Sequence, residues 1–285
     1  MTVAITGATG LVGSRLVSRL ASEGNAVRVL TRNPSSARSK FAGVPNVTFY
    51  GPESWIDAVR SCDGVVNLAG EPIATRWTPE LKAEIKRSRV ATTKKVRTPA
   101  ASAGVTALGS IPTITRLLQL ADAINTVPAA SRPRVLVSAS AVGFYGVSET
   151  QSFDEDSRSG SDYLAEVCRE WESVAKTAQV DRLAIVRIGI VLAREGGALG
   201  KMLPAFQLFA GGPLGTGNQW FSWIHRDDLV GLLVEALRNP GYSGVLNGTA
   251  PNPVRMSEMC KALGDQMGRP SWVPVPDFVL KVRGW

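Results

Sequence analysis

The chain has 285 residues, of which 44% are hydrophobic, with a formal net charge of +8 and three cysteines. This composition excludes disorder of the whole chain and allows one large α/β domain, or a main domain with a smaller appendage. We expect no transmembrane segment, and the widely spaced cysteines predict no metal site and no disulfide framework. The basic residues lack aromatic interleaving, which predicts a basic surface that favours phosphorylated ligands and no nucleic-acid partner.

The N-terminal residues read as a dinucleotide-binding turn. A β-branched strand over residues 3–6 runs into a loop with Gly7, Gly10 and Gly13, and an amphipathic helix over residues 11–22 follows. Such glycines allow a tight turn, close approach of a pyrophosphate, and packing of the helix on the strand. The alternative is a purely structural turn. The expected cofactor contacts are Gly7, Ala8, Thr9, Gly10, Leu11, Val12 and Gly13.

Strand and helix signals then alternate over the first two thirds of the chain, which predicts an α/β fold with a doubly wound parallel sheet. Further strands are expected at residues 26–31, 47–50, 64–68, 134–140 and 183–188. Further helices are expected at residues 79–96, 115–125, 161–178 and 227–237. We expect a Rossmann domain over residues 1–190 and a smaller substrate-binding portion over residues 191–285. The uncharged residues 98–115 predict an insertion, either a flexible surface loop or an irregularity of the gene model.

The end of the second strand indicates which dinucleotide is bound. NAD-binding turns usually carry an acidic residue there, whereas this strand ends in Thr31 and Arg32. A guanidinium can hold a 2′-phosphate, so the sequence predicts NADP(H) as cofactor, with Thr31 and Arg32 as contacts. Arg32 could instead be an exposed charge at a helix entry. Residues 66–70 line the adenine and ribose side of the groove, with Leu68, Ala69 and Gly70 as expected cofactor contacts, or are an ordinary buried strand end.

Four motifs occur in an order that resembles the extended short-chain dehydrogenase/reductase superfamily: residues 6–13, 66–70, 138–146 and 223–228. Residues 211–215 and 247–253 resemble its "epimerase family protein" branch, and within that branch a plant plastid, cell-division-inhibitor-like form. The resemblance implies an NAD(P)-binding Rossmann fold, a chloroplast location and protein partners in plastid division. Family members continue beyond the match to residues 275–281, so we expect this chain, which ends at Trp285, to lack a short C-terminal segment.

The resemblance also implies catalytic roles. In this superfamily a Tyr four residues before a Lys transfers a proton, and a Ser on the neighbouring strand polarises the substrate oxygen. These roles carry over to Tyr163 and Ser140, and Tyr145 is a second phenol in the same neighbourhood. Val167 stands where the Lys belongs, so no cation there lowers the pKa of the Tyr163 phenol. We therefore expect a degenerate catalytic site, in which Tyr163 either still acts or packs on the nicotinamide ribose.

Several other residues have two interpretations. His225, the only histidine, is either a titrating group or part of a structural turn, and Asp227 is expected to cap the following helix. Arg187 orients substrate or cofactor, or pairs with Glu172. Three tryptophans form an apolar substrate wall or belong to the core: Trp77, Trp220 and Trp223.

Two functions fit these observations. The first is an NADP(H)-dependent oxidoreductase or epimerase acting on an unknown small-molecule substrate, with Ser140 and one of the two tyrosines handling the oxygen. The second is a non-catalytic regulator that binds the cofactor and acts through protein partners. Restoring Lys at position 167 would distinguish them, because carbonyl turnover should rise only at a site arranged for chemistry.

Overall fold

The computed structural model describes residues 1–70 and 116–273. The helix expected at residues 79–96, the insertion at 98–115, Trp77 and the C-terminal motif at 275–281 lie outside the described residues. None of the described helices combines the length and the hydropathy of a membrane-spanning segment.

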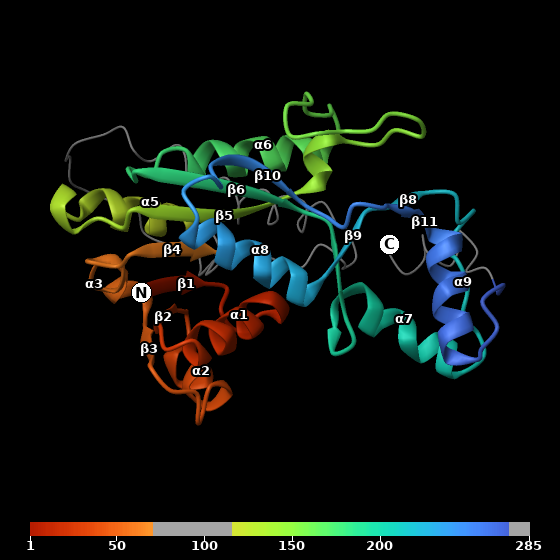
Figure 1. Cartoon of the computed structure of the whole chain (residues 1–285), viewed down its shortest axis with the longest axis horizontal. Coiled ribbons are helices and arrows are strands. Elements are labelled where there is room, and N and C mark those ends of the chain that lie inside the picture. Colours follow the sequence, from red (N-terminus) through yellow and green to blue (C-terminus); the bar gives the residue numbers. More distant parts are fainter. Residues whose placement is uncertain (71–115, 274–285) are drawn as a thin grey trace, which may run out of the picture.

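Seven parallel strands of the described chain form one sheet, in the order β10-β6-β5-β4-β1-β2-β3 (Figure 1). The chain runs from β1 outward to β3 and then returns to place β4 on the other side of β1, so the strand order reverses between β1 and β4. This arrangement confirms the doubly wound fold, and each expected strand is found within one residue at each end. The strands are β1 (Thr2–Thr6), β2 (Ala26–Leu30), β3 (Val47–Tyr50), β4 (Gly64–Asn67), β5 (Val135–Ala141), β6 (Arg182–Ile188) and β10 (Gly244–Gly248).

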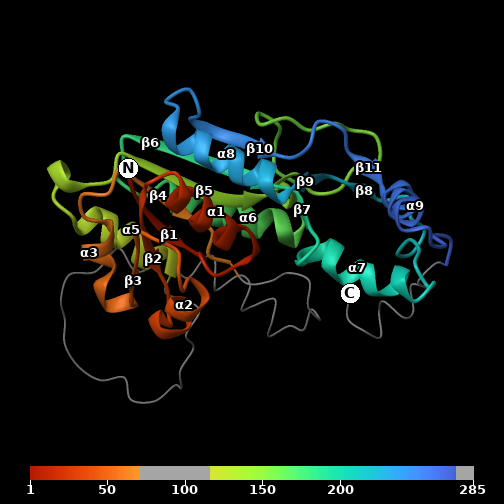
Figure 2. The same ribbon diagram turned by 60° about the horizontal axis from the view of Figure 1, so that its bottom comes forward.

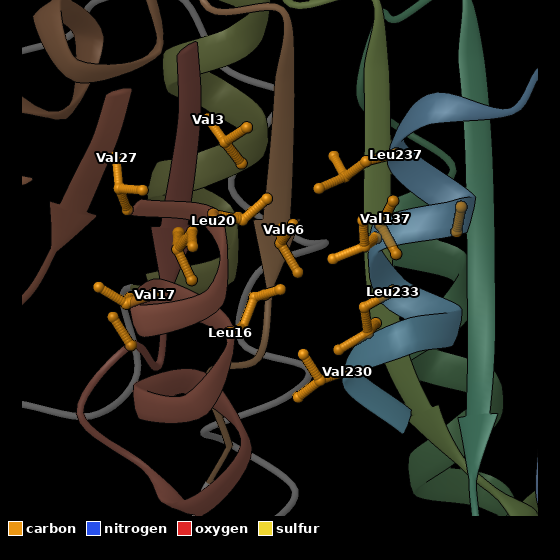
Figure 3. Packing of buried hydrophobic residues seen from close by; sticks show 14 of the residues in the cluster. Val3, Leu16, Val17, Leu20, Val27, Val66, Val137, Val230, Leu233 and Leu237 are labelled. Carbon is orange, nitrogen blue, oxygen red and sulfur yellow. The ribbon is translucent and has the colours of Figure 1, made fainter. Parts of the chain in front are cut away.

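Helices cover both faces of the sheet. One face carries α1 (Leu11–Ser22), α2 (Pro34–Lys40) and α8 (Arg226–Arg238). The other carries α3 (Trp55–Val59), α5 (Arg116–Thr126) and α6 (Tyr163–Ala175). Figure 3 shows α1 and α8 packing side by side on the first face, where α1 buries a stripe at helical spacing. The buried residues of that stripe are Leu16, Val17, Leu20 and Ala21.

A smaller lobe extends beyond the carboxyl ends of the strands (Figures 1 and 2). It has its own core of Leu192, Phe206, Phe221, Met256 and Cys260. Its elements are β7 (Ile190–Ala193), α7 (Gly197–Gln207), β8 (Trp220–Phe221), β9 (Trp223–His225), β11 (Val254–Arg255) and α9 (Met256–Met267).

The chain crosses between the sheet and the lobe more often than a single boundary at residue 190 implies. After β9 it returns to the main layers for α8 and β10, and it leaves them again for β11 and α9. The edge strand β10 pairs with β6, so part of residues 191–285 belongs to the Rossmann sheet. The pairing joins strands far apart in sequence, which local patterns do not reveal.

The parallel strands β7 and β9 form a two-stranded ribbon between the two cores. Successive strand side chains point to opposite faces. Accordingly Val191 and Ile224 pack in the core beneath α8, whereas Leu192 and Trp223 pack in the core of the lobe. The β7–β9 ribbon therefore contributes to both cores.

Candidate functional site

The glycine loop has the geometry of a phosphate-binding turn. Gly7 has φ of +68°, and a Cβ there would lie 2.4 Å from the Leu68 carbonyl oxygen. Gly10 donates its N–H to the Gly7 carbonyl over 3.0 Å and begins α1 without a side-chain cap. A Cβ at Gly13 would lie 2.3 Å from the Gly7 oxygen. The three glycines thus allow the turn, leave the helix N-terminus open, and bring α1 against the turn.

The other residues of this loop form its two surfaces. Ala8 is buried against the core, whereas Thr9 is exposed. Leu11 and Val12 are half-buried at the start of α1. The Leu11 methyl groups reach the β7–α7 turn, where a Cβ at Gly197 would meet one of them at 3.2 Å. The loop therefore lies between the sheet edge and the lobe.

The end of β4 meets this loop. A Cβ at Gly7 would also lie 2.8 Å from the Ala69 nitrogen, so residues after β1 and β4 are in close approach at the point where the strand order reverses. Leu68 and Ala69 are half-buried and Gly70 is exposed. Ligands of open α/β sheets bind in the crevice at such a point.

A buried asparagine orders that crevice. Asn67 accepts a hydrogen bond from the Thr6 hydroxyl at 2.7 Å and from the Ala69 N–H at 3.4 Å, and donates its amide to the Ser138 hydroxyl at 3.2 Å. The three side chains are on neighbouring strands in register. Asn67 lies within residues 66–70, which were expected to line the groove, whereas no role was predicted for Ser138. Polar residues at the ends of apolar strands were the available signal.

The end of β2 carries the expected cation. Thr31 is half-buried, and its hydroxyl accepts the Asn33 N–H at 3.3 Å. Asn33 in turn caps α2 by accepting the Ser36 N–H. Arg32 is exposed and has no hydrogen-bond or ion-pair partner in the described part of the chain. Within the described residues, its charge is therefore available to an anion.

Ser140 belongs to a buried ionic network. Its hydroxyl donates to Glu172 Oε1 at 2.8 Å, and Arg187 holds both oxygens of that carboxylate, at 2.9 Å and 3.0 Å. Ser140, Glu172 and Arg187 are each less than 5% exposed. The alternative in which Arg187 pairs with Glu172 is therefore confirmed.

Tyr145 is bound by the same guanidinium. Its hydroxyl accepts from Arg187 Nη1 at 3.0 Å and donates to the Asn247 side-chain oxygen at 2.6 Å. The strand register places these residues together, because Arg187 on β6 pairs with Ser140 on β5 and with Asn247 on β10. The Tyr145 ring stacks on Phe153, with 5.3 Å between centroids. The structure thus brings Ser140 and Tyr145 into one network and engages both hydroxyl protons within the protein.

The network holds its charge. Burial alone would lower the pKa of the Arg187 guanidinium, but hydrogen bonds with Glu172 and Tyr145 outweigh burial, so that pKa is raised above its ordinary value. The Arg187 Cζ atom lies 3.4 Å from the centroid of the Phe144 ring, which adds a cation–π contact.

Tyr163 is the first residue of α6. It is half-buried, and the Asp162 side chain caps the helix by accepting the Ala165 N–H at 2.9 Å. Val167, one turn further along, is 2% exposed. A Lys at position 167 would therefore bury its ammonium group, so the Val167→Lys test must include a measurement of stability.

The structure also assigns His225 and Asp227. His225 caps α8, because its Nδ1 accepts the Asp227 N–H at 3.2 Å. This confirms the structural interpretation and corrects the expectation that Asp227 is the cap. The Asp227 carboxylate instead accepts two hydrogen bonds from Arg15 on α1, at 2.9 Å and 3.0 Å.

Two further groups of side chains are candidates for the site by their chemistry, the cysteines and the tryptophans. Burial raises the pKa of the Cys62 and Cys260 thiols to about 11, so they are not nucleophiles at neutral pH. Trp220 is 45% exposed and binds the Glu149 carbonyl, and Trp223 packs in the lobe core. Among the described residues, no group of His, Cys, Asp or Glu is arranged to hold a metal ion.

Comparisons with known proteins agree with this geometry. Residues 3–247 match the family described as "NAD dependent epimerase/dehydratase family". The chloroplastic SDR39U1 homolog of Arabidopsis thaliana, an epimerase family protein, is 55% identical over 99% of this chain and 75% of its own length. The Bacillus subtilis epimerase family protein YfhF is 35% identical over 98% of this chain and 84% of its own length.

A solved structure is similar over the same range. The human epimerase family protein SDR39U1, crystallised with NADPH, superposes with a TM-score of 0.79 at 32% identity, over 99% of this chain and 85% of that one. The matched family and these relatives confirm the resemblance predicted from the motifs. The chain therefore belongs to the NAD dependent epimerase/dehydratase family, among its SDR39U1-like epimerase family proteins.

Proposed function

We propose that the protein binds NADP(H) in the crevice between β1 and β4, as an oxidoreductase-like member of its family with a degenerate catalytic site. The observation that carries this proposal is the geometry of the glycine loop. The tight turn at Gly7 lies against the backbone after β4, and the open N-terminus of α1 lies at the same point, where the strand order reverses. The exposed Arg32 and the NADPH of the human relative support the phosphorylated cofactor over NAD(H).

The proposed chemistry rests on the residues that the family resemblance assigns to it. A bound dinucleotide would supply hydride chemistry, and the protein would orient it and handle the oxygen of the substrate. Tyr163 at the start of α6 is the proposed proton-transfer residue, with Ser140 and Tyr145 as further candidates. Ser140 and Tyr145 would first have to release the acceptors that they bind, Glu172 and Asn247. Because no Lys stands four residues after Tyr163 to activate its phenol, turnover is expected to be slow.

A direct titration tests the cofactor. We expect NADPH to bind more tightly than NADH, with Arg32→Ala weakening NADPH by about tenfold through loss of one charge-assisted contact. NADH binding should change by less than about twofold, because a 2′-hydroxyl has no charge for Arg32 to neutralise. Nicotinamide fluorescence would give both constants. Equal affinity for the two cofactors in the wild-type protein would contradict the proposal.

A second candidate function is a non-catalytic cofactor-binding regulator. The absence of a Lys at position 167 and the two engaged hydroxyls favour it, because Ser140 and Tyr145 already donate to Glu172 and Asn247. Single-turnover mixing of NADPH-loaded protein with a panel of small aldehydes separates the two functions. Oxidation of NADPH that Tyr163→Phe abolishes supports catalysis, and binding without oxidation supports the regulator.

The Arabidopsis relative, whose name includes "chloroplastic", supports a plastid location for this protein. Fractionation of chloroplasts with an antibody to the protein would test that location. The role in plastid division remains a hypothesis from the motif resemblance, and loss of the gene product without a change in plastid number would contradict it.

A further inference from the structure

Lys40 contacts the glycine loop, although it lies outside the loop motif. It is the last residue of α2, and its Nζ donates to the Thr9 carbonyl oxygen over 2.7 Å. Thr9 lies between Gly7 and Gly10, so a cation stands beside the turn that we assign to the dinucleotide.

Strand pairing places this contact near the end of β2. Thr6 and Leu30 are partners in the β1–β2 register, so the loop after β1 and the residues from Thr31 onward leave the sheet at the same edge. The 2′ position of the adenosine ribose is bound at this edge in dinucleotide folds. Lys40 of α2 therefore contacts the loop at this edge, and Arg32 follows β2 at the same edge.

The segment between these two cations has no negative charge to compete with a phosphate. Residues 31–40 include three basic residues and no acidic one. The third, Arg38, is directed elsewhere, with its guanidinium over the Phe49 ring at 5.4 Å from the centroid. Lys40 itself has no carboxylate partner within the described residues.

We propose that Lys40 is a specificity-determining residue, which binds the 2′-phosphate of NADP(H) together with Arg32. The proposal rests on the proposed cofactor function. An ammonium group has three N–H donors, and the Thr9 carbonyl takes one of them. The others are available to phosphate oxygens, and the loop contact fixes the ammonium group before the ligand arrives. NADH, which carries a hydroxyl at this position, gains little from the charge.

A merely structural role for Lys40 has a different signature. If Lys40 only fastens α2 to the loop, its loss disturbs the whole turn and weakens both cofactors equally. Lys40→Gln separates the two roles, because glutamine keeps an N–H donor for the Thr9 carbonyl and removes the charge. Lys40→Arg keeps the charge and serves as the conservative variant.

The experiment measures dissociation constants for NADPH and NADH with the wild-type protein, Lys40→Gln, Lys40→Arg and the matched control Arg38→Gln. We expect Lys40→Gln to weaken NADPH by about tenfold and NADH by less than about twofold. Lys40→Arg should stay within about threefold of wild type for NADPH, and Arg38→Gln should not alter the preference for NADPH over NADH. Melting temperatures of the free proteins should be similar.

The outcomes distinguish the role of Lys40 from the proposed binding of NADP(H). A preference for NADPH that Arg32→Ala reduces and Lys40→Gln leaves intact overturns the inference alone. Equal weakening of NADPH and NADH by Lys40→Gln also overturns it, because only the structural contact is then lost. Failure of the wild-type protein to prefer NADPH overturns both proposals.

Discussion

Arg187 joins three parts of the molecule through one side chain. Its guanidinium contacts Glu172 on α6, the Tyr145 hydroxyl after β5, and the Glu155 carbonyl in the following loop. Arg187 and Glu172 are almost wholly buried, since each is 4% exposed. Removing one partner of such a pair leaves an uncompensated charge in the interior.

We therefore expect Arg187→Met to lower the free energy of unfolding by roughly 3–5 kcal/mol, which urea denaturation would measure. The double variant Arg187→Met with Glu172→Leu should lose less than the sum of the single losses, because no buried charge remains unpaired. Strict additivity would show that the two charges do not interact across 2.9 Å as described.

The residues also show which parts of the site could be predicted. The glycine loop was predictable because its function depends on seven consecutive residues and their local backbone. The network around Arg187 was only half predictable, since Arg187 and Glu172 are charges within apolar segments whose pairing can be inferred. Asn247 lies 102 residues from Tyr145, and only the β6–β10 register brings the two together.

Helices α1 and α8 offer a matched pair of glycines at the scale of the element. A Cβ at Gly13 in α1 would meet the Gly7 carbonyl oxygen at 2.3 Å, whereas at Gly231 in α8 the nearest atom lies 3.6 Å away. We expect Gly13→Ala to destabilise the protein by about 1–3 kcal/mol and to weaken NADPH binding, because backbone atoms must move. Gly231→Ala should stabilise it by roughly 0.5–1 kcal/mol through helix propensity. Chemical denaturation of both variants checks this, and equal effects would contradict it.

The same two helices are joined by ion pairs that predict a pH dependence. Hydrogen bonds from Arg15 and Arg226 hold the pKa of the Asp227 carboxyl below its ordinary value. Burial would raise the pKa of Glu23, but Arg19 and Arg238 outweigh it and the pKa is lowered. Groups with lowered folded-state pKa values stabilise the protein above their unfolded pKa and lose that contribution as the pH falls through the folded value.

We therefore expect the melting temperature to decrease as the pH drops below about 4. The decrease should be less steep in the double variant Glu23→Gln with Asp227→Asn. The effect should be small and weakened by salt, because these pairs are largely exposed. Asp181→Asn is the control, since the described structure gives this exposed carboxyl no ion pair. An acid transition identical in the double variant and the wild type would contradict the assignment.

Elements with a strong local pattern were predicted well, and the others were not. The amphipathic α1 was predicted at its observed bounds, whereas α2 and α3 have seven and five residues and too few turns to show a period. The glycine-rich stretch at 196–217 hid α7, whose Leu199, Met202 and Phe206 pack into the lobe core. Tertiary packing there outweighs the low helix propensity of glycine.

At the scale of the whole molecule, the lobe and the sheet are connected at several points. The chain passes between them after β6, after β9 and after β10. A loop also bridges them, because Arg255 of the lobe pairs with Glu149 at 2.9 Å while Glu155 of the same loop accepts the Asn247 N–H at 2.8 Å. We therefore expect the described sheet and lobe to move little relative to each other.

The β7–β9 ribbon adds a thermodynamic consequence. Because Val191 and Ile224 belong to the main core and Leu192 and Trp223 to the lobe core, melting of the lobe removes side chains from beneath α8. The two cores should unfold as one cooperative unit, with equal calorimetric and van't Hoff enthalpies. Any ligand that binds only the folded glycine loop would then protect the lobe as well. Tryptophan fluorescence from Trp220 and Trp223 would in that case report cofactor binding through a shift in melting temperature, although neither residue belongs to the glycine loop.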